Sequence, residues 1–441
     1  MPTPDPPVQP SLRRTLGRWD LTAIGVNQVI GSAIFLMPSE VASQIGTWAP
    51  TAFVAAGLAS LLVALCFAEV GSRFDVTGGP YIFTRAAFGR FAAFEVGWMQ
   101  WFTRATSQAS VANGIALALG FYWPVMTTGA GRATMLVGLI VVLAAINVRG
   151  IKQSAWLVNL LTVGKLVPLA VFILVGLFFL DPGRLVPLPA ISTGQAASAA
   201  LLLIFVYGGY DVIPVPAGEA HDPRRHVPFA LVLTIVIVTA VMTLAQIVAT
   251  GVLPDLPSSS TPLADASLIM LGGGGAMLVG IGSVISMTGN NAGQVLTGSR
   301  MLFALAENGE LPRFFGRIHP TFRTPANAIV FTSAVALLLA LTGSFVALAA
   351  VSAVARLVTY VGACAATLAL RAPRYEQAVQ PASFVIPLGP VVPVLAVAIS
   401  MAILAGASWA QLVGGALALL GGAALFWLNQ VLHPHPGRAR P

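Results

Sequence analysis

The chain has 441 residues, of which 57% are hydrophobic and only 9% are charged. So few polar groups could not cover the surface of a water-soluble fold, so the composition excludes a soluble globular protein and indicates a lipid environment. The formal net charge of +8 does not indicate nucleic-acid binding, because the basic residues are scattered over short loops and form no stripe. The two cysteines, Cys66 and Cys364, lie in apolar runs and predict neither a disulfide framework nor a metal site.

The first segment, residues 1–18, is polar and Pro-rich at its start and contains three arginines near its end. We expect a disordered cytoplasmic tail and not a cleavable signal, so the first apolar segment stays in the protein. A second short cytoplasmic tail is expected at residues 433–441.

The apolar segments that follow have the length of membrane spans. A helix needs about 20 apolar residues to cross the hydrocarbon core, and about twelve windows qualify. They cover residues 21–41, 49–70, 91–121, 133–148, 155–180, 196–217, 228–253, 267–298, 326–341, 345–370, 383–406 and 408–431. The pattern predicts an all-α polytopic membrane protein.

The basic residues indicate the orientation of these spans. With loops assigned alternately to the two sides, 18 of the 23 Lys and Arg residues fall on the inner side and two on the outer side. The remaining three, Arg104, Lys165 and Arg356, lie within spans. Positive charge accumulates on the cytoplasmic side of membrane proteins, so we expect both termini in the cytoplasm.

The first and sixth spans contain helix-breaking residues in their middle. The first has a Gly-Ser-Ala run that begins at Gly31 and a proline at Pro38, and the sixth has residues 207–211 followed by Pro214 and Pro216. Freed backbone groups at membrane depth are tolerated only where they are buried in protein or line a cavity. The alternative is a pair of packing kinks. The separation of five spans favours a binding site at the interface of two inverted repeats.

The chemistry of two broken helices indicates the ligand. Half-helix N-termini present free N–H groups that suit a carboxylate, and the carbonyl ends of unwound segments suit an ammonium. One zwitterion satisfies both, so the expected ligand is an amino acid or a related amine.

Four further segments make the chain similar to a known family. Residues 31–38 resemble the family pattern G-S-G-[IV]-F-x-x-P, and residues 67–97 resemble its loop between the second and third helices. Residues 217–230 and 299–325 resemble its signatures after the sixth and eighth helices. With these motifs in order, the chain resembles the amino acid–polyamine–organocation permeases from about residue 21 to about residue 370.

The resemblance implies a LeuT-like fold of five-plus-five inverted repeats. The implied core covers residues 19–372, with repeats of about 19–181 and 194–372, and two additional helices follow at 373–432. It also implies secondary transport of amino acids across the cell membrane. The implied partners are a small-molecule substrate, protons and the lipid bilayer, with no nucleic acid, no cofactor and no metal.

The resemblance also implies where the substrate binds. The backbone of the first break would hold the carboxylate, the sixth span would hold the ammonium and side chain, and Phe205 would close over the substrate. The second Gly of the family motif is Ala33 here, whose methyl group narrows the approach to the carboxylate. The expected substrate-binding residues are Ile30, Gly31, Ser32, Ala33, Ile34, Phe205, Tyr207, Gly208, Gly209, Tyr210 and Asp211.

The charges within spans are candidates for function, since ionisable groups at bilayer depth are costly. In many members of the family a lysine at the position of Lys165 occupies the place of a sodium ion, so we expect sodium-independent and proton-coupled transport. Asp211 could contact a substrate amine, titrate, or accept hydrogen bonds near the break. For Arg104 and Arg356 we expect pairing with an acid such as Glu69, Glu95 or Asp211. Asn290 and Asn291 are expected to bond between helices.

The sequence lacks the motifs of several other classes of function. The sequence has no HExxH, no Gly-x-Ser-x-Gly after a strand and no Walker loop, so an enzyme is not expected. A channel would not need two broken helices in symmetric positions. A nutrient sensor on the same fold, an amino acid/polyamine exchanger and a cationic substrate all stay open at this stage.

Overall fold

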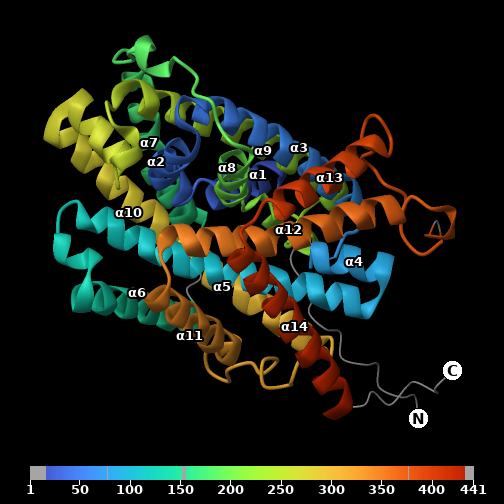
Figure 1. Ribbon diagram of the computed structural model, residues 1–441. Coiled ribbons are helices and arrows are strands. Elements are labelled where there is room, and N and C mark those ends of the chain that lie inside the picture. The colour runs from blue at the N-terminus through green and yellow to red at the C-terminus, as the bar shows by residue number, and fades with distance from the viewer. Residues whose placement is uncertain (1–15, 77, 151–154, 376, 433–441) are drawn as a thin grey trace, which may run out of the picture.

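A computed structural model describes residues 16–76, 78–150, 155–375 and 377–432 (Figure 1). The two expected tails, 1–18 and 433–441, lie outside these ranges except for residues 16–18, of which Arg18 is already helical. Every regular element in the described ranges is a helix, in agreement with the predicted fold class.

The α-helices follow one another in chain order with short connections. They are α1 Arg18–Val29, α2 Ala33–Ile45, α3 Ala49–Gly71, α4 Pro80–Phe88, α5 Arg90–Gly120, α6 Gly129–Arg149, α7 Ala155–Gly176, α8 Thr193–Val206, α9 Pro223–Val252, α10 Pro262–Glu307, α11 Ala326–Thr342, α12 Phe345–Ala369, α13 Val391–Ala405 and α14 Trp409–Leu432. The 3₁₀ turns between them are η1 Gly46–Trp48, η2 Pro124–Thr127, η3 Pro182–Leu185, η4 Tyr210–Val212, η5 Ala217–Glu219, η6 Leu256–Ser258 and η7 Pro373–Tyr375.

These helices coincide with the predicted spans, apart from their ends. Six helical segments of the described chain are long and apolar enough to cross a membrane: Ala33–Gly71, Gly129–Arg149, Pro223–Val252, Pro262–Glu307, Phe345–Ala369 and Trp409–Leu432. The other predicted spans coincide with helices that are shorter, more polar or described only in part. The helix α5 is one of the more polar ones, because it contains Glu95, Arg104 and several amides. The multi-pass helical architecture is therefore confirmed, while the count of about twelve spans stays a prediction.

The start of α13 and the presence of α4 differ from prediction. The eleventh predicted span began at residue 383, but α13 begins at Val391. Pro387 and Pro390 prevent a helix here, and Leu388 and Gly389 have φ of 65° and 60°. The helix α4 was not predicted, since its 9 residues are too few to span a membrane. Its start at Pro80 and its end at Gly89 nevertheless follow the usual Pro and Gly signals.

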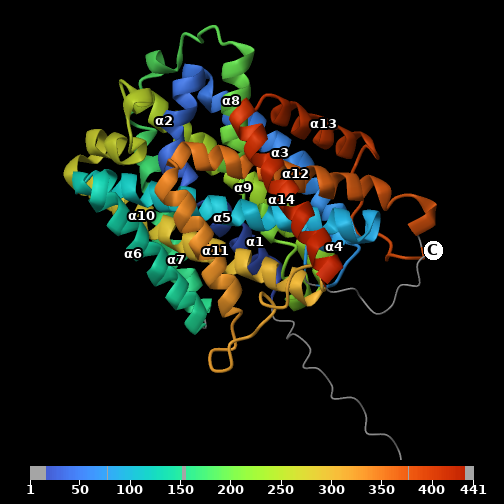
Figure 2. The ribbon, with the colours of Figure 1, turned by 60° about the horizontal axis from the view of Figure 1, so that its bottom comes forward.

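The long helix α5 lies at the centre of the molecule, and Figures 1 and 2 show α10 and α12 running beside it. It contacts α10, α12, α4, α11 and α14, while α3 packs along α9. The pair α6 and α11 covers the side of α5 that is opposite α3 and α9 (Figure 1). Next to this framework, α1 contacts α9 and η4, and α2 contacts α8. The two interrupted helices thus pack against the long helices of this framework, of which α10 is itself kinked at Gly272, with φ of 67°.

Candidate functional site

The first break separates α1 from α2 at residues 30–32, where the sequence places Gly31 and Ser32. The carbonyl groups that the break frees receive side-chain donors from distant helices. Lys165 Nζ of α7 donates to Asn27 O at 2.7 Å and to Ile30 O at 2.9 Å. Asn290 Nδ2 of α10 donates to Gln28 O at 2.9 Å. The unwound backbone is therefore held by three interhelical hydrogen bonds, as buried carbonyls require.

The N-terminus of α2 stays open on the other side of the break. The first N–H groups of a helix have no intrahelical partner and usually need a capping side chain. Ser32 is the N-cap residue, but its hydroxyl makes no capping hydrogen bond. Ser32 and Ala33 are both buried and line a cavity. The N–H groups at this helix end can therefore donate hydrogen bonds to an anionic oxygen.

The second break follows α8, which ends at Val206, and the chain stays largely non-helical until α9 starts at Pro223. Gly209 has φ of 139°, which residues with a Cβ rarely adopt. A Cβ on Gly209 would lie 2.8 Å from the backbone of Gln28. The glycine thus allows the second break to touch the backbone of the first, although 181 positions of sequence separate the two residues.

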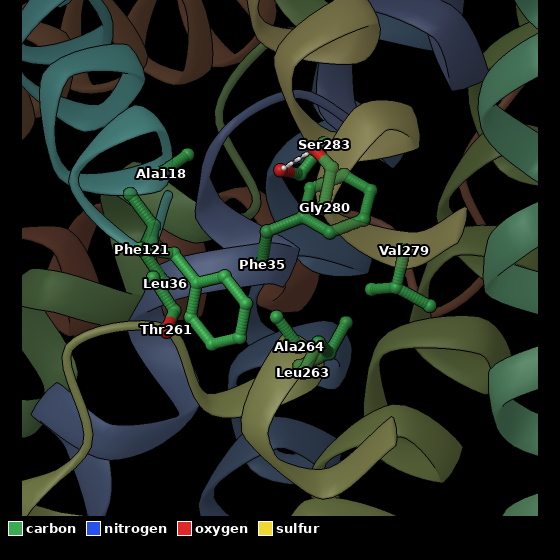
Figure 3. Close-up of a pocket in the computed structure, with 10 residues that line it drawn as sticks. All are labelled: Phe35, Leu36, Ala118, Phe121, Thr261, Leu263, Ala264, Val279, Gly280 and Ser283. Atoms are coloured by element: carbon green, nitrogen blue, oxygen red, sulfur yellow. Dashed lines mark hydrogen bonds between the residues drawn. The ribbon is translucent and has the colours of Figure 1, made fainter. Parts of the chain in front are cut away.

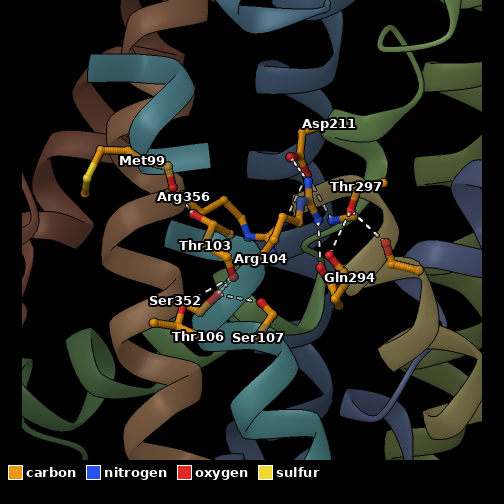
Figure 4. Close-up of polar contacts among 12 residues, drawn as sticks. Met99, Thr103, Arg104, Thr106, Ser107, Asp211, Gln294, Thr297, Ser352 and Arg356 are labelled. Carbon is orange, nitrogen blue, oxygen red and sulfur yellow. Dashed lines mark hydrogen bonds and ion pairs between the residues drawn. The ribbon is translucent and has the colours of Figure 1, made fainter. Parts of the chain in front are cut away.

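Asp211 lies directly after this contact and is buried at 1% exposure. Its Oδ1 accepts a hydrogen bond from Arg356 Nη1 at 2.8 Å and from the backbone N–H of Gly209 at 3.2 Å. Its Oδ2 pairs with Arg104 Nη2, and Arg104 Nη1 also donates to Gln294 Oε1 at 3.4 Å (Figure 4). Of the acids considered as partners for the two arginines, Asp211 is the one that pairs with both.

The other two acids lie elsewhere. Glu69 accepts hydrogen bonds from Nε and Nη2 of Arg371, at 2.6 and 2.5 Å, and from the backbone N–H of Ile386, at 2.9 Å. The hydrogen bonds that Arg371 donates to Glu69 raise the pKa of Arg371. Neither carboxylate oxygen of Glu95 has a hydrogen-bond partner within the described ranges. These groups therefore brace or line other parts of the bundle.

The two breaks share a cavity of about 20 Å³. That is room for about one water molecule and is smaller than an amino acid, so binding requires the walls to move apart. The wall combines the backbone of the first break with Phe205 and Gly208 of the second. Its polar side chains are Gln28, Ser32, Ser107, Asn290, Gln294 and Arg356. Its chemistry is thus polar on α1, α5, α10 and α12 and aromatic on α8.

A second cavity, of about 10 Å³, lies between α2, α5 and α10 (Figure 3). Its wall includes Phe35, Leu36, Phe121 and Leu263. Of its two hydroxyl side chains, Ser283 donates to its own helix at Gly280 O, 2.7 Å away. An apolar wall of this kind suits side-chain packing and offers no charged partner to a zwitterion.

The residues expected to bind substrate divide into two groups. Gly31, Ser32, Ala33, Phe205 and Gly208 line the shared cavity, together with the polar side chains above. The other expected residues lie behind this wall, where they contact the backbone or neighbouring helices. They are Ile30, Ile34, Tyr207, Gly209, Tyr210 and Asp211.

The two tyrosines show where the second group points. Tyr207 Oη donates to Phe53 O of α3 at 2.7 Å. The ring of Tyr210 stacks on Tyr360, with centroids 5.4 Å apart, and meets Phe67 edge-on. Tyr207 therefore packs against α3 and Tyr210 against α3 and α12, and neither lines the cavity.

Sequence reasoning missed several cavity residues, for which helical spacing was a usable signal. Gln294 follows Asn290 by four positions and shares its face of α10, where its Nε2 donates to Asn290 Oδ1 at 3.3 Å. Ser107 follows Arg104 by three positions on α5 and hydrogen-bonds Ser352 at 2.7 Å. The expected interhelical role of the asparagines is confirmed, because Asn291 Nδ2 donates to Gln108 O of α5 at 3.1 Å.

Comparisons with known proteins find similar sequences. Residues 16–428 match the model of a family described as amino acid permease. The chain is 28% identical over 442 residues to the branched-chain amino acid permease BcaP of Bacillus subtilis, covering 96% of this chain and 94% of the relative. It is 28% identical to the methylthioribose transporter of the same organism, covering 91% of each chain. It is 29% identical to the serine/threonine exchanger SteT of B. subtilis, covering 89% of this chain and 91% of the relative.

Proposed function

Since the chain belongs to the amino acid permease family, we propose that it is a secondary active transporter that moves amino acids across the cell membrane by alternating access. In this proposal transport is uptake into the cell, needs no sodium and is coupled to protons. Family membership already establishes a multi-pass membrane transporter of amino acids that is not an enzyme. The coupling ion, the direction of transport and the site residues are the proposed part.

The proposed architecture is the five-plus-five inverted repeat. Residues 19–181 form the first repeat, residues 194–372 the second, and residues 373–432 two additional helices. Both termini lie in the cytoplasm. Support comes from the position of the two breaks, each in the first span of its repeat, and from their contact at Gly209 and Gln28.

The observation that carries the proposed coupling is the contact of Lys165 with the first break. A monovalent cation in a membrane protein is bound by carbonyl oxygens of unwound helices. Lys165 Nζ takes up two such oxygens, at 2.7 and 2.9 Å, and its side chain is 2% exposed. An ammonium on these carbonyls substitutes for a sodium ion, and a buried lysine can release its proton during a transport cycle.

The geometry at Asp211 supports Lys165 as the group that handles the proton. Asp211 faces two guanidinium groups, Arg104 and Arg356, and both of its oxygens are hydrogen-bonded. Two adjacent cations stabilise the carboxylate against protonation. Among the described residues, Lys165 Nζ hydrogen-bonds to these two carbonyls, so loss of its proton leaves no acid unpaired.

The test is uptake of labelled amino acids into proteoliposomes that contain the purified protein. We expect an inward proton gradient to drive accumulation in sodium-free buffer and an inward sodium gradient at equal pH to add nothing. The substitution Lys165→Met should abolish proton-driven accumulation. A requirement for the sodium gradient, with no response to the pH gradient, would contradict the proposal.

An exchanger is the second candidate, because one similar protein is a serine/threonine exchanger. Counterflow distinguishes the two mechanisms. Preloading the vesicles with unlabelled amino acid should accelerate uptake in both cases, but only an exchanger would show no uptake into empty vesicles. Saturable binding with no flux under any gradient would instead identify a sensor.

A further inference from the structure

The shared cavity carries positive charge and no negative charge in its wall. Among the described residues that line it, Arg356 is the one ionisable side chain. Resting on the proposed function, we infer that the substrate is an amino acid with an anionic side chain, whose second carboxylate binds Arg356. This inference names the substrate class of the site described above.

Arg356 has a donor to spare for such a group. Its Nη1 is bonded to Asp211, whereas its Nε is buried and makes no hydrogen bond to any described residue. The arginine side chain as a whole is 2% exposed. A buried donor without a partner is costly, and a carboxylate within reach of the guanidinium would remove that cost.

A second unused donor lies in the same wall. Gln28 lines the cavity from α1, is 8% exposed, and its Nε2 has no hydrogen-bond partner within the described part of the chain. The wall also holds the uncapped N-terminus of α2 at Ser32. Three sets of N–H donors therefore surround one cavity, and donors bind the oxygens of anions.

The acid nearest the cavity is not available to a cationic substrate. Asp211 receives Arg356 and Gly209 N on Oδ1 and Arg104 on Oδ2. A substrate ammonium would have to displace one arginine and leave it unpaired in the bundle, which is strongly unfavourable. The geometry therefore disfavours a cationic amino acid or a polyamine.

The lack of a side chain at Gly208 makes room for the guanidinium of Arg356 at the second break. A Cβ built on Gly208 would lie 2.3 Å from Arg356 Cζ and 2.5 Å from Arg356 Nε. Only a residue without a side chain allows the arginine to rest against the backbone between α8 and η4. The substrate's α-carboxylate can then bind the start of α2, while its side-chain carboxylate binds Arg356 on the opposite wall.

The net charge of the buried cluster of Arg104, Arg356 and Asp211 agrees with an anionic substrate. Arg104 and Arg356 each carry one positive charge, and Asp211 carries one negative charge, so the cluster has an excess of one positive charge. All three side chains are 2% exposed. A net charge in a low-dielectric interior is unfavourable, and an acidic amino acid, with a net charge of −1, compensates it. A neutral zwitterion does not.

The experiment compares isosteric pairs of substrates on the wild-type protein in proteoliposomes. L-glutamate and L-glutamine differ in charge but hardly in shape, and so do L-aspartate and L-asparagine. We expect the KM of the acid in each pair to be at least roughly tenfold lower than the KM of its amide. This is the size expected for one charge-assisted hydrogen bond. Equal or tighter binding of the amides would overturn the inference and leave the proposed function intact. Uptake and binding of no amino acid at all would overturn both.

Two variants test the role of Arg356 separately from folding. Arg356→Gln should bring the two KM values of each pair together. Gly208→Ala keeps the charge but displaces the guanidinium, and should raise KM for glutamate more than for glutamine. Arg184→Gln removes one positive charge from a partly exposed loop and serves as the control, with an unchanged KM ratio. If Gly208→Ala, properly folded, kept the wild-type preference for the acids, Arg356 would not be the binding group.

Discussion

The two broken helices solve the same physical problem with opposite chemistry. At the first break the exposed groups are carbonyls, and donors cover them: Lys165 and Asn290 reach Asn27, Gln28 and Ile30 from two other helices. At the second break an acid, Asp211, accepts the N–H of Gly209 and draws two arginines into the bundle.

The difference has a consequence for ligand binding. Lys165 and Asn290 at the first break donate to the backbone, which leaves that break with the open N-terminus of α2 and the Nε2 of Gln28 as its free donors among the described residues. The arginines at the second break are used only in part, because Arg356 Nε stays without a partner among the described residues. The first break therefore offers backbone N–H groups to a ligand, and the second offers a guanidinium.

The largest effect should come from removing the acid at the second break. Asp211→Asn leaves Arg104 and Arg356 buried without a counter-charge, and breaking a buried pair in this way costs about 3–5 kcal/mol. We expect a marked fall in the melting temperature of the purified protein and loss of uptake. Asp181→Asn, in an exposed pair with Arg184, is the control and should melt as the wild type does. Equal melting of Asp211→Asn and the wild type would show that Asp211 does not balance the arginines.

The next effect should come from the donor at the first break. Lys165→Met keeps the length of the side chain but leaves Asn27 O and Ile30 O without the ammonium, at a cost of about 1.5–3 kcal/mol for a lost charged hydrogen bond. We expect lower thermal stability together with loss of proton-driven uptake. Val167→Ala, on an exposed position of the same helix, is the matched control. Full proton-driven uptake by the Lys165 variant would show that Lys165 is not needed for proton coupling.

A smaller effect should come from the close approach of α10 to the first break. A Cβ on Gly31 would lie 2.6 Å from Asn290 Nδ2, so Gly31→Ala should push the amide away from Gln28 O. Overpacking of this kind costs about 1–3 kcal/mol. We expect a lower melting temperature and weaker substrate binding in thermal-shift titrations. Gly289→Ala, whose Cβ would meet nothing within 4 Å, is the control on α10 and should behave as the wild type. Identical results for the two glycines would contradict the packing seen at Gly31.

The smallest effect is expected at Ala33, in the first turn of α2. Ala33→Gly removes one methyl group from the cavity wall and costs about 0.5–1 kcal/mol in helix stability. The variant should keep transport and keep or widen the range of amino acids accepted, as measured by competition with a labelled substrate. Abolished binding would show that the carboxylate is not held at this turn.

The sequence predicted the elements of this site better than their contacts. The breaks were predictable because Gly, Pro and a polar run act locally on helix formation, within residues 31–38 and 207–216. The charges within spans were predictable because a single arginine or lysine stands out in an apolar window. Both kinds of signal need only the neighbouring residues.

The pairing of these elements was not predictable in the same way. Asp211 is 107 positions from Arg104 and 145 from Arg356, and the choice of Asp211 over Glu69 or Glu95 depends on how α5 and α12 pack. The inward positions of Arg356 and Gln28 depend on the same packing. Tyr207 and Tyr210 were expected in the cavity because they are aromatic residues at the second break. Packing instead directs their rings to α3 and α12. Local patterns therefore locate a break, while tertiary contacts decide which side chains face the ligand.

We propose that substrate binds between the two breaks, against the start of α2. The most direct measurement is the rate of thiol labelling of Ser32→Cys in a protein whose Cys66 and Cys364 are replaced by Ala. Ser32 lines the cavity, so bound amino acid should slow labelling in proportion to its occupancy in a parallel thermal-shift titration. Labelling at an unchanged rate under saturating amino acid, with the thermal shift still present, would place the substrate elsewhere and contradict the account.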